Sequence, residues 1–416
     1  GMALLIITHD LGVVANIAKE VVIIYQGAIM ESGGVEDIFR HPGHDYLKGL
    51  FKAVPHFNMK EGERLTPLRE IPHKSDSPLL KKQPRPEGLD NSRPLLQVVN
   101  LKKTFVTRKG SFFSGSGESM VRAINGVSFD IRRGECFGLV GESGCGKTTL
   151  GKIIMCAMAP DEGEVVFNDR GQSVNLPDLD PNALMPIRRK IQMIFQDPFS
   201  SLNPRMTVFD IIREPLIIHN IGDRQSQAEL VKELMRLVGL DPRCLNRYPH
   251  CFSGGQCQRI GIARALALKP ELMICDEPVS ALDVSIQAQV LNLLKDLQTE
   301  LGLTYLFISH NLAVVDYIAT RIAVMCRGRL VEMAPRELLF SNPVHPYTRA
   351  LIDVVPYPDL DRKLDLGKLG GERVSDPASW REPFFVGDDR QAEFINLGGG
   401  HIVLAAKGAD EKNLVA

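Results

Sequence analysis

The sequence contains no long hydrophobic run. Its longest apolar stretches, such as Ala3–Ile7 and Val21–Ile24, fall well short of the ~18 residues that a bilayer-spanning helix needs. We therefore expect a soluble chain, with any membrane role exercised through partner proteins. The chain also lacks a charge surplus, because 49 Lys and Arg residues balance 50 Asp and Glu residues and leave a net charge of -1. A dedicated nucleic-acid-binding protein normally carries a basic surplus, so nucleic acid is not an expected partner.

The eight cysteines form no CxxC pair, and the amino-terminal residues lack the features of a secretory signal. This usage predicts reduced thiols, not a disulfide framework or a zinc site. The composition is otherwise that of a globular protein, with 44% apolar and 24% charged residues, which is enough to bury a large core. A length of 416 residues suggests two or three domains of ~150 residues each.

An internal repeat is the first informative feature. The segment Leu5–Pro55 aligns with Leu306–Pro356 at a constant offset of 301 residues, without a gap. Chance similarity between two apolar stretches would need gaps and would not align turn residues. The aligned pairs include Gly27 with Gly328, Glu31 with Glu332, His44 with His345 and Tyr46 with Tyr347. Each copy predicts a buried strand, a short helix, a strand, a glycine turn, a strand and a final helix.

The repeat and the composition divide the chain into four segments. Residues 1–55 are predicted to be the end of a first domain, whose complete copy is residues 95–356, so we expect the natural protein to extend upstream by most of a domain. Residues 56–94 are rich in proline and charge, which predicts a disordered or polyproline linker. Residues 108–119 are rich in Gly and Ser and indicate a loop inserted in a hairpin. The composition of the tail, residues 357–416, is mixed and predicts no definite structure.

The complete domain begins with a phosphate-binding motif. The apolar strand Cys136–Val140 runs into Gly141–Thr148, and the helix-like segment Thr149–Ala159 follows, which is GxxxxGK[ST] in its strand–loop–helix setting. The glycines would let backbone N–H groups surround the phosphates of a nucleotide. The alternative interpretation of this segment is a glycine-rich turn with a purely structural role. Lys147 would reach the β- and γ-phosphates of ATP, and the Thr148 hydroxyl would bind Mg²⁺. The candidate nucleotide-binding residues are Gly141, Ser143, Gly144, Cys145, Gly146, Lys147, Thr148 and Thr149.

Two adjacent carboxylates are the last residues of another predicted buried strand, Leu272–Glu277. Adjacent acids usually belong to a solvated surface, but Asp276 and Glu277 precede Pro278 and should lie at the edge of the sheet where ligands bind. Asp276 would then hold Mg²⁺ directly or through water. Glu277 would act as the general base on the attacking water.

Three further features become informative only alongside the phosphate loop and the acid pair. Ser253-Gly254-Gly255-Gln256 precedes the helix-like segment Cys257–Leu268, and taken alone it could be a capped turn. Gln196 ends the apolar strand Ile191–Phe195, and His310 ends the strand Thr304–Ser309. A histidine at a strand end is ordinarily structural. All three positions become functional candidates because they share one chain with the phosphate loop and the acid pair.

The complete set resembles an ATP-binding-cassette ATPase over Leu95–Pro356. The segments Phe195–Pro204 and His345–Thr348 are similar to the oligopeptide/dipeptide permease type, including members that fuse two cassettes. The resemblance implies an α/β fold: a P-loop NTPase cassette with a mixed or parallel sheet core, an antiparallel β subdomain and an α-helical subdomain at roughly 197–259.

The resemblance also implies a role for each motif. Gln196 would sense the γ-phosphate and Mg²⁺ and link to the permease, and His310 would contact the γ-phosphate. Ser253, Gly254, Gly255 and Gln256 would form the signature that faces the ATP of a second cassette. Asp283 would be the aspartate that follows the acid pair, and Phe105 would stack on adenine. The sequence departs from the family at Cys251, where an acidic residue is common, and at Asn311, where Asp is usual.

The predicted function is therefore an ATP-hydrolysing subunit that energises import of peptides or a similar small solute. Its implied cofactors are ATP and Mg²⁺. Its implied partners are membrane permease subunits, indirectly an extracytoplasmic solute-binding protein, and a second cassette, in a homodimer or pseudo-dimer. It would work at the cytoplasmic face of the inner or plasma membrane. The alternative is a soluble ATPase scaffold, similar to the accessory cassettes of phosphonate metabolism or to ribosome-associated ATPases.

Overall fold

The computed structural model describes residues 2–57, 59, 62–71, 93–108, 118–361, 375–385, 392–410 and 414. Its largest sheet contains β5 (Cys136–Val140), β8 (Ile191–Ile194), β9 (Leu272–Asp276), β10 (Thr304–Ser309), β11 (Arg321–Cys326), β12 (Arg329–Pro335), β13 (Ala392–Asn396) and β14 (Ile402–Ala406). The strands follow the order β13-β14-β12-β11-β5-β10-β9-β8, and neighbours from β11 to β8 are parallel. Strands β5, β9 and β10 are buried along their whole length, as their continuous apolar sequences require.

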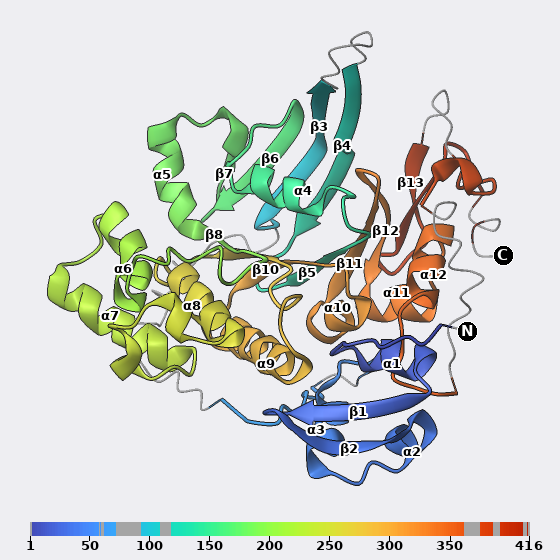
Figure 1. The fold of residues 1–416 in the computed structure, drawn as a ribbon. Coiled ribbons are helices and arrows are strands. Elements are labelled where there is room, and N and C mark those ends of the chain that lie inside the picture. Colours follow the sequence, from blue (N-terminus) through green and yellow to red (C-terminus); the bar gives the residue numbers. More distant parts are fainter. Residues whose placement is uncertain are drawn as a thin grey trace, which may run out of the picture.

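A second, antiparallel sheet lies on one side of the first (Figure 1). It contains β3 (Leu96–Arg108), β4 (Glu118–Ile131), β6 (Glu162–Asp169) and β7 (Gln172–Asn175) in the order β4-β3-β6-β7. Helix α4 (Lys147–Ile154) lies between the sheets, and it ends five residues before Ala159, the end that the sequence predicts. Helix α5 (Pro181–Lys190) leads into β8. The tip of the β3–β4 hairpin, where the sequence indicates an inserted loop, lies outside the described residues.

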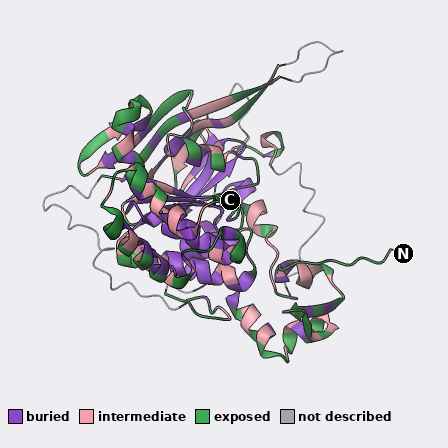
Figure 2. Cartoon of the chain, turned by 60° about the vertical axis from the view of Figure 1, so that its left-hand side comes forward, coloured by how far each residue is buried: buried purple, intermediate pink, exposed green. Residues whose placement is uncertain are grey.

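Helices lie on the opposite side of the large sheet, some against its strands and some against one another. They are α6 (Val208–Ile218), α7 (Arg224–Leu237), α8 (Gly254–Leu266), α9 (Val284–Leu301) and α10 (Leu312–Ile318), followed by α11 (Arg336–Ser341) and α12 (Pro346–Asp353). One apolar core lies between sheet and helices, a second lies between the two sheets, and both are purple in Figure 2. The predicted α/β cassette with its antiparallel and helical parts is therefore confirmed. Within the described ranges, no helix has both the length and the apolarity to cross a bilayer.

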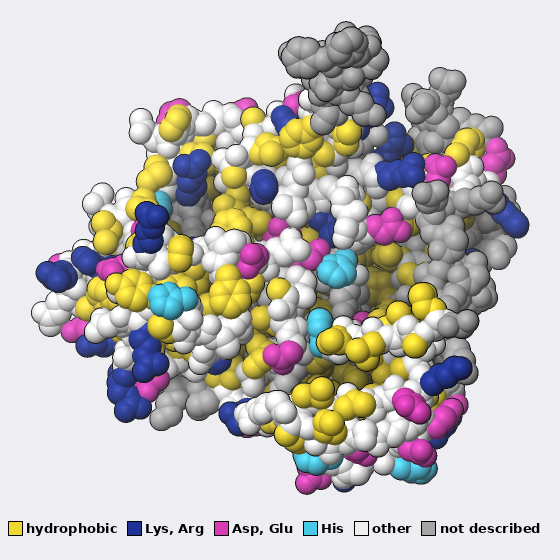
Figure 3. Space-filling model, viewed as in Figure 1, with side chains coloured by type: hydrophobic (Ala, Val, Ile, Leu, Met, Phe, Trp, Pro, Cys, Tyr) yellow, Lys and Arg dark blue, Asp and Glu magenta, His cyan; other side chains and the backbone are white. Residues whose placement is uncertain are grey.

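The amino-terminal fragment contains α1 (Leu11–Ile17), β1 (Glu20–Tyr25), β2 (Ala28–Gly34), α2 (Val35–Arg40) and α3 (Asp45–Ala53). The buried strand predicted at the start of the first copy is wrong, because the apolar run Ala3–Ile7 forms no strand and Ile7 is 93% exposed. Its counterpart β10 pairs with β5 on one side and β9 on the other, and the fragment contains neither neighbour. Without hydrogen-bonding neighbours an apolar segment has no sheet to join. Figure 3 shows hydrophobic side chains gathered over this part of the surface.

The first part of the linker packs on the cassette, contrary to the prediction from composition. Phe57, Met59 and Leu65 are buried, and the Phe57 ring lies 4.9 Å from the ring of Phe340 between ring centres. Sparse apolar residues were enough for burial because each enters a surface that the cassette already provides. Linker residues 58, 60, 61 and 72–92 lie outside the described part of the chain.

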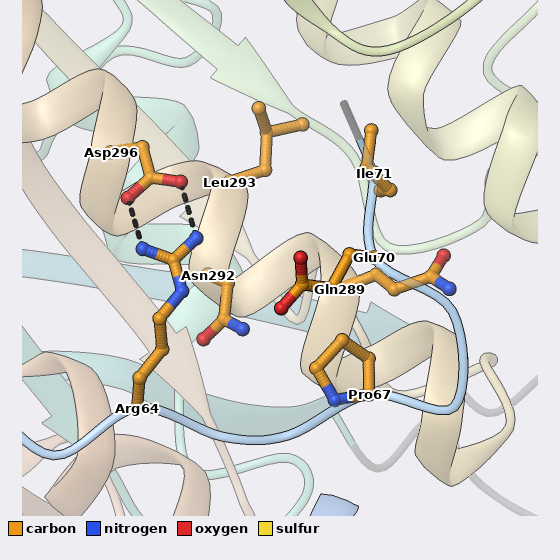
Figure 4. A pocket seen from close by; sticks show the side chains of 8 residues that line it. All are labelled: Arg64, Pro67, Glu70, Ile71, Gln289, Asn292, Leu293 and Asp296. Carbon is orange, nitrogen blue, oxygen red and sulfur yellow. Dashed lines mark hydrogen bonds and ion pairs between the residues drawn. The ribbon is translucent and has the colours of Figure 1, made fainter. Parts of the chain in front are cut away.

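Residues 64–71 follow the outer face of α9 (Figure 4). Asn292 donates its side-chain N–H to the Leu65 carbonyl at 2.9 Å, and Gln289 donates to the Arg69 carbonyl at 2.7 Å. Arg64 forms two hydrogen bonds to the Asp296 carboxylate, at 2.8 and 2.7 Å. These α9 positions lie on one helix face. This face of α9 therefore binds the linker backbone through polar side chains. The amino-acid composition of the linker gives no indication of such binding.

The tail adds structure that the sequence did not predict. Strand β14 pairs with β12, so the tail extends the main sheet. His401 forms a buried 2.7 Å contact with the Glu332 carboxylate, and the rings of Trp380 and Phe384 lie against His345. The tail thus covers the second copy of the repeat.

Candidate functional site

The candidate site lies where four parallel strands end. In the sheet register, Ser309 of β10 stands beside Val140 of β5, and Ile308 stands beside Asp276 of β9. Ile194 of β8 stands beside Cys275. Because parallel strands share one carboxyl edge, the residues that follow them converge there. The phosphate loop, Gln196, Glu277 and His310 all start from this edge.

The phosphate loop requires glycine at two positions. Gly141 has φ +153° and Gly146 has φ +113°. A Cβ atom would lie 2.1 Å from the Met325 carbonyl oxygen at the first position, and 2.2 Å from the Ala123 carbonyl oxygen at the second. Both contacts are closer than any carbon–oxygen contact allows, so the loop can pass through this space only with glycine.

Lys147 lies beneath the loop and is buried. Its ammonium donates to the carbonyl oxygens of Gly141, at 2.7 Å, and Glu142, at 2.9 Å. Ser143 and Gly144 are exposed at the top of the loop, and Thr149 is half-buried in α4. The loop therefore has a buried positive charge below and open backbone above, which suits an anion.

Cys145 is structural in this arrangement. The side chain is buried, and burial raises the pKa of its thiol in spite of the neighbouring Lys147 ammonium. A thiol that resists ionisation is a poor nucleophile. Its carbonyl oxygen instead accepts from the Gly328 N–H at 2.9 Å and ties the loop to the β11–β12 turn.

Two oxygen groups face each other beside the loop. The Thr148 hydroxyl donates to an Asp276 carboxylate oxygen at 3.2 Å. Asp276 is almost fully buried, and burial raises the pKa of its carboxyl group, with a smaller opposing effect of the Thr148 hydrogen bond. Hydroxyl and carboxylate oxygens are the donors that Mg²⁺ prefers. The pair therefore fits the divalent cation that the sequence predicts.

A second cluster is centred on Glu277. The Gln196 amide donates to a Glu277 carboxylate oxygen at 3.0 Å, and His310 Nδ1 lies 3.0 Å from the same oxygen. Glu277 has φ +47°, a conformation unusual for a residue with a side chain, and its N–H donates to the Ile308 carbonyl. The strained backbone holds the carboxylate next to two polar groups. Gln196 thus contacts Glu277, and it makes no recorded bond to the Thr148–Asp276 pair in the described structure.

The remaining candidates lie on other elements. Ser253 caps α8 in a reciprocal capping box with Gln256, and the Asp283 carboxylate caps α9 by accepting from the Ile286 N–H. A Cβ atom on Gly255 would lie 2.1 Å from the Ile286 side chain, so the signature turn packs tightly against α9. Phe105 is 36% exposed on β3, with the Lys103 ammonium 6.0 Å from its ring centre. Within the described residues, no hydrogen bond or ion pair joins these positions to the phosphate loop.

One residue that sequence reasoning gave no role contacts the loop. The Tyr347 hydroxyl accepts a hydrogen bond from the Glu142 N–H at 3.1 Å. The available signal was the repeat, which pairs Tyr347 with Tyr46 and so marks the position as one that both copies keep.

Phosphate loop, buried lysine, oxygen pair and polarised carboxylate together define a P-loop NTPase of the cassette type. The comparison with known families agrees: residues 124–280 match the ABC transporter family. The oligopeptide/dipeptide transporter C-terminal region matches twice, at residues 30–78 and 331–378. Each match begins within one copy of the repeat, at the same offset of 301 residues, and extends past the end of that copy. The chain belongs to the ATP-binding-cassette transporter family and carries this region in both copies.

Similar proteins extend the comparison. The chain is 48% identical to the glutathione import ATP-binding protein GsiA of Salmonella paratyphi A, over 87% of this chain and 57% of that protein. It is 42% identical to GsiA of Pectobacterium atrosepticum, over 97% of this chain and 63% of that protein. The chain thus spans about three-fifths of the length of these relatives. The dimeric, post-hydrolysis structure of the ATP-binding cassette MJ0796 bound to ADP and Pi matches with a TM-score of 0.51 and 32% identity, over 58% of this chain and 98% of that one.

Proposed function

We propose that this chain hydrolyses ATP to energise the import of peptides or a similar small solute through separate membrane permease subunits. The observation that carries the proposal is the convergence of Lys147, the Thr148–Asp276 pair and the Glu277 cluster at one sheet edge. This arrangement provides a phosphate cradle, oxygen ligands for a cation and a carboxylate for a water molecule. Those are the parts that phosphoryl transfer to water requires.

Each side chain has a separate task in this proposal. Lys147 leaves the loop carbonyls and binds the β- and γ-phosphates of ATP, while the loop amides bind their oxygens. Thr148 and Asp276, with Gln196 closing in, would hold Mg²⁺, which neutralises charge on the phosphate oxygens when bound. Glu277 accepts the proton of the attacking water, and Gln196 and His310 orient the Glu277 carboxylate. His310 also donates to the γ-phosphate.

In this proposal, the signature of one cassette acts on the ATP that a partner cassette holds. Ser253–Gln256 is the amino end of α8, whose free N–H groups attract an anion. In a head-to-tail pair of cassettes, this end would face the γ-phosphate held by the other cassette, with Asp283 at the contact. The helical subdomain at 197–259 would pass the motion to the permease. The chain would then act at the cytoplasmic face of the membrane, served by an extracytoplasmic solute-binding protein.

The proposed solute class rests on the relatives. They are named for glutathione import, and glutathione is a peptide. Two matches to the oligopeptide/dipeptide transporter C-terminal region support the same class and favour an importer over the soluble scaffold. Co-purification with a membrane permease would separate these two functions, because a scaffold of phosphonate metabolism or of the ribosome would bring soluble partners instead.

Replacing Glu277 with Gln tests the chemistry. The substitution keeps the size of the side chain and removes the proton acceptor, so we expect kcat for ATP hydrolysis to fall by about 10²-fold or more. ATP binding should persist, and ATP should trap the variant as a pair, seen as a doubled mass in light scattering. Glu36→Gln, which changes an exposed acid of α2, is the matched control. Unchanged turnover in Glu277→Gln would refute the general-base role.

A further inference from the structure

The phosphate loop is held from outside the nucleotide site by Gly328, which donates to the Cys145 carbonyl oxygen, and also by one side chain. Glu142 is the second residue of the loop, and its N–H donates to the Tyr347 hydroxyl at 3.1 Å. Its carbonyl oxygen accepts from the Lys147 ammonium at 2.9 Å. The peptide groups on both sides of Glu142 are therefore fixed, one by Lys147 of the loop itself and one by a residue of α12.

Tyr347 is itself held firmly. Its side chain is 1% exposed, and its N–H donates to His345 Nδ1 at 3.1 Å at the start of α12. The Tyr347 hydroxyl also reaches the Cys326 thiol, which contacts the Ser375 carbonyl oxygen of the tail at 3.7 Å. Burial raises the pKa of Tyr347 far above its usual range, so the hydroxyl keeps its proton. Tyr347 therefore lies between the phosphate loop, which it contacts through Glu142, and Cys326, which contacts the tail.

The first copy of the repeat contains the same histidine–tyrosine arrangement at the start of its last helix, without a phosphate loop. Tyr46 donates its N–H to His44 Nδ1 at 3.0 Å, as Tyr347 does to His345. Its ring stacks on Tyr25, 4.3 Å away between ring centres, and Tyr25 is the counterpart of Cys326 at the same offset. The local structure of α12 therefore forms without any phosphate loop. What distinguishes Tyr347 is the bond to Glu142.

We propose that Tyr347 is a positioning residue, whose hydroxyl holds the Glu142 peptide and so prepares the phosphate loop to bind ATP. The second oligopeptide/dipeptide transporter region thereby acts on nucleotide affinity. This inference rests on the proposed ATPase function. It concerns binding and not the water attack, because Tyr347 makes no recorded contact with Gln196, Glu277 or His310.

The test compares Tyr347→Phe with Tyr46→Phe. Each variant loses one hydroxyl and keeps its ring, but only the first loses the bond to the loop. We expect KM for ATP to rise about fivefold in Tyr347→Phe, the factor that one hydrogen bond of ordinary net strength represents, with kcat nearly unchanged. Tyr46→Phe should match the unmodified protein. Equal KM values in both variants, or a loss in kcat alone, would overturn the inference.

Direct binding keeps this inference separate from the proposed function. A fluorescent ATP analogue gives Kd without hydrolysis: if the unmodified protein binds it but does not hydrolyse ATP, the proposed function fails and Tyr347 is still tested. The Kd should rise about fivefold in Tyr347→Phe. An equal Kd would contradict the positioning role.

Amide exchange tests the bond without any variant. In the nucleotide-free protein, the Glu142 amide should exchange more slowly than the exposed Ser143 and Gly144 amides, because it has an acceptor in Tyr347. Equal exchange at all three amides would show that the bond is not maintained in solution. This measurement therefore decides the case even if Tyr347→Phe folds poorly.

Discussion

At the scale of single residues, the three glycines of the phosphate loop have different reasons to be glycine. Gly141 and Gly146 leave no room for a Cβ atom, because backbone carbonyl oxygens would lie 2.1 and 2.2 Å from it. Gly144 has φ +83° but open space around it. A side chain at Gly144 would strain only the left-handed backbone. At Gly141 or Gly146 it would also collide with a carbonyl oxygen from another part of the chain.

Alanine substitutions should separate these causes. We expect Gly146→Ala to lower ATP affinity by about tenfold or more, because the loop must move away from the Ala123 carbonyl by more than a small adjustment. Gly144→Ala should cost about 1 kcal/mol of stability from its left-handed backbone and should bind ATP with a smaller loss. Titration calorimetry with ATP measures both. Equal losses would mean that steric contact does not decide the loop geometry.

The ionised Asp276 carboxylate is expected to lower the stability of the folded protein and to favour cation binding. Burial raises the pKa of its carboxyl group, so the folded protein holds this proton more tightly than the unfolded chain does. Stability therefore falls as pH rises from the unfolded towards the folded pKa, and at neutral pH the ionised group is a cost without a cation. A bound divalent cation would offset that cost.

Asp276→Asn should reverse both effects. In EDTA at pH 7 we expect a higher melting temperature than in the unmodified protein, with the difference shrinking below about pH 4, where the unmodified carboxyl is protonated too. With Mg²⁺ present, ATP affinity should fall at least about tenfold, the loss that even outer-shell metal partners produce. Calorimetric melting and binding at both conditions check this. An ATP affinity that keeps its full Mg²⁺ dependence would remove Asp276 from the cation site.

At the scale of elements, α9 holds the linker with two buried amides, Gln289 and Asn292, and with one ion pair nearer the surface. Asn292 is buried, donates to the Leu65 carbonyl and accepts from the Tyr317 hydroxyl. The Arg64–Asp296 pair lies nearer the surface, with the Arg64 side chain 60% exposed. Buried hydrogen bonds leave unpaired groups when one partner is removed, whereas exposed ion pairs contribute little.

Two substitutions on α9 test this distinction. Asn292→Ala should cost roughly 2–3 kcal/mol and speed proteolysis of residues 62–71, because Leu65 and Tyr317 both lose a buried partner. Asp296→Asn should cost at most about 1 kcal/mol and leave proteolysis nearly unchanged. Urea unfolding and limited digestion measure the two effects. If both variants digest equally fast, Asn292 holds the linker no more firmly than the ion pair does.

Sequence reasoning succeeded for elements whose pattern is local. Strand β10 has the predicted bounds, Thr304–Ser309, because a continuous apolar run between polar ends allows few alternatives. It failed at Ala3–Ile7, which has the same apolar character, because a strand also needs neighbours that the pattern does not mention. It failed again at the linker, where the polar face of α9 provides the binding surface.

The candidate site divides in the same way. The motifs placed Asp276 and His310 at the ends of strands and Lys147 in the loop that follows a third strand, and the fold brings those strand ends together. The bond from Glu142 to Tyr347 joins residues 205 positions apart and leaves no mark on either local sequence. The repeat and the His345–Thr348 segment drew attention to Tyr347, but neither identified Glu142 as its partner.

At the scale of the whole molecule, the two copies of the repeat share one local device in different surroundings. In the first copy, the Glu31 carboxylate accepts from the Gly43 and His44 N–H groups; in the second, Glu332 accepts from Val344 and His345. The tail buries only the second, through His401. The repeat is thus the same local structure used twice. The described residues contain one phosphate loop and one signature, both in the cassette that includes the second copy.

One phosphate loop and one signature per described chain make pairing testable by mixing. Lys147→Ala removes the phosphate-binding charge, and Ser253→Arg blocks the signature, so each variant alone should be inactive. In a mixed pair, the intact loop of the Ser253→Arg chain faces the intact signature of the Lys147→Ala chain. If variants pair at random and sites act independently, half of the pairs carry one working site of two, so an equal mixture should recover about a quarter of the normal ATPase rate. A site completed within one chain would recover none, and the recovery should vanish on dilution below the pairing concentration.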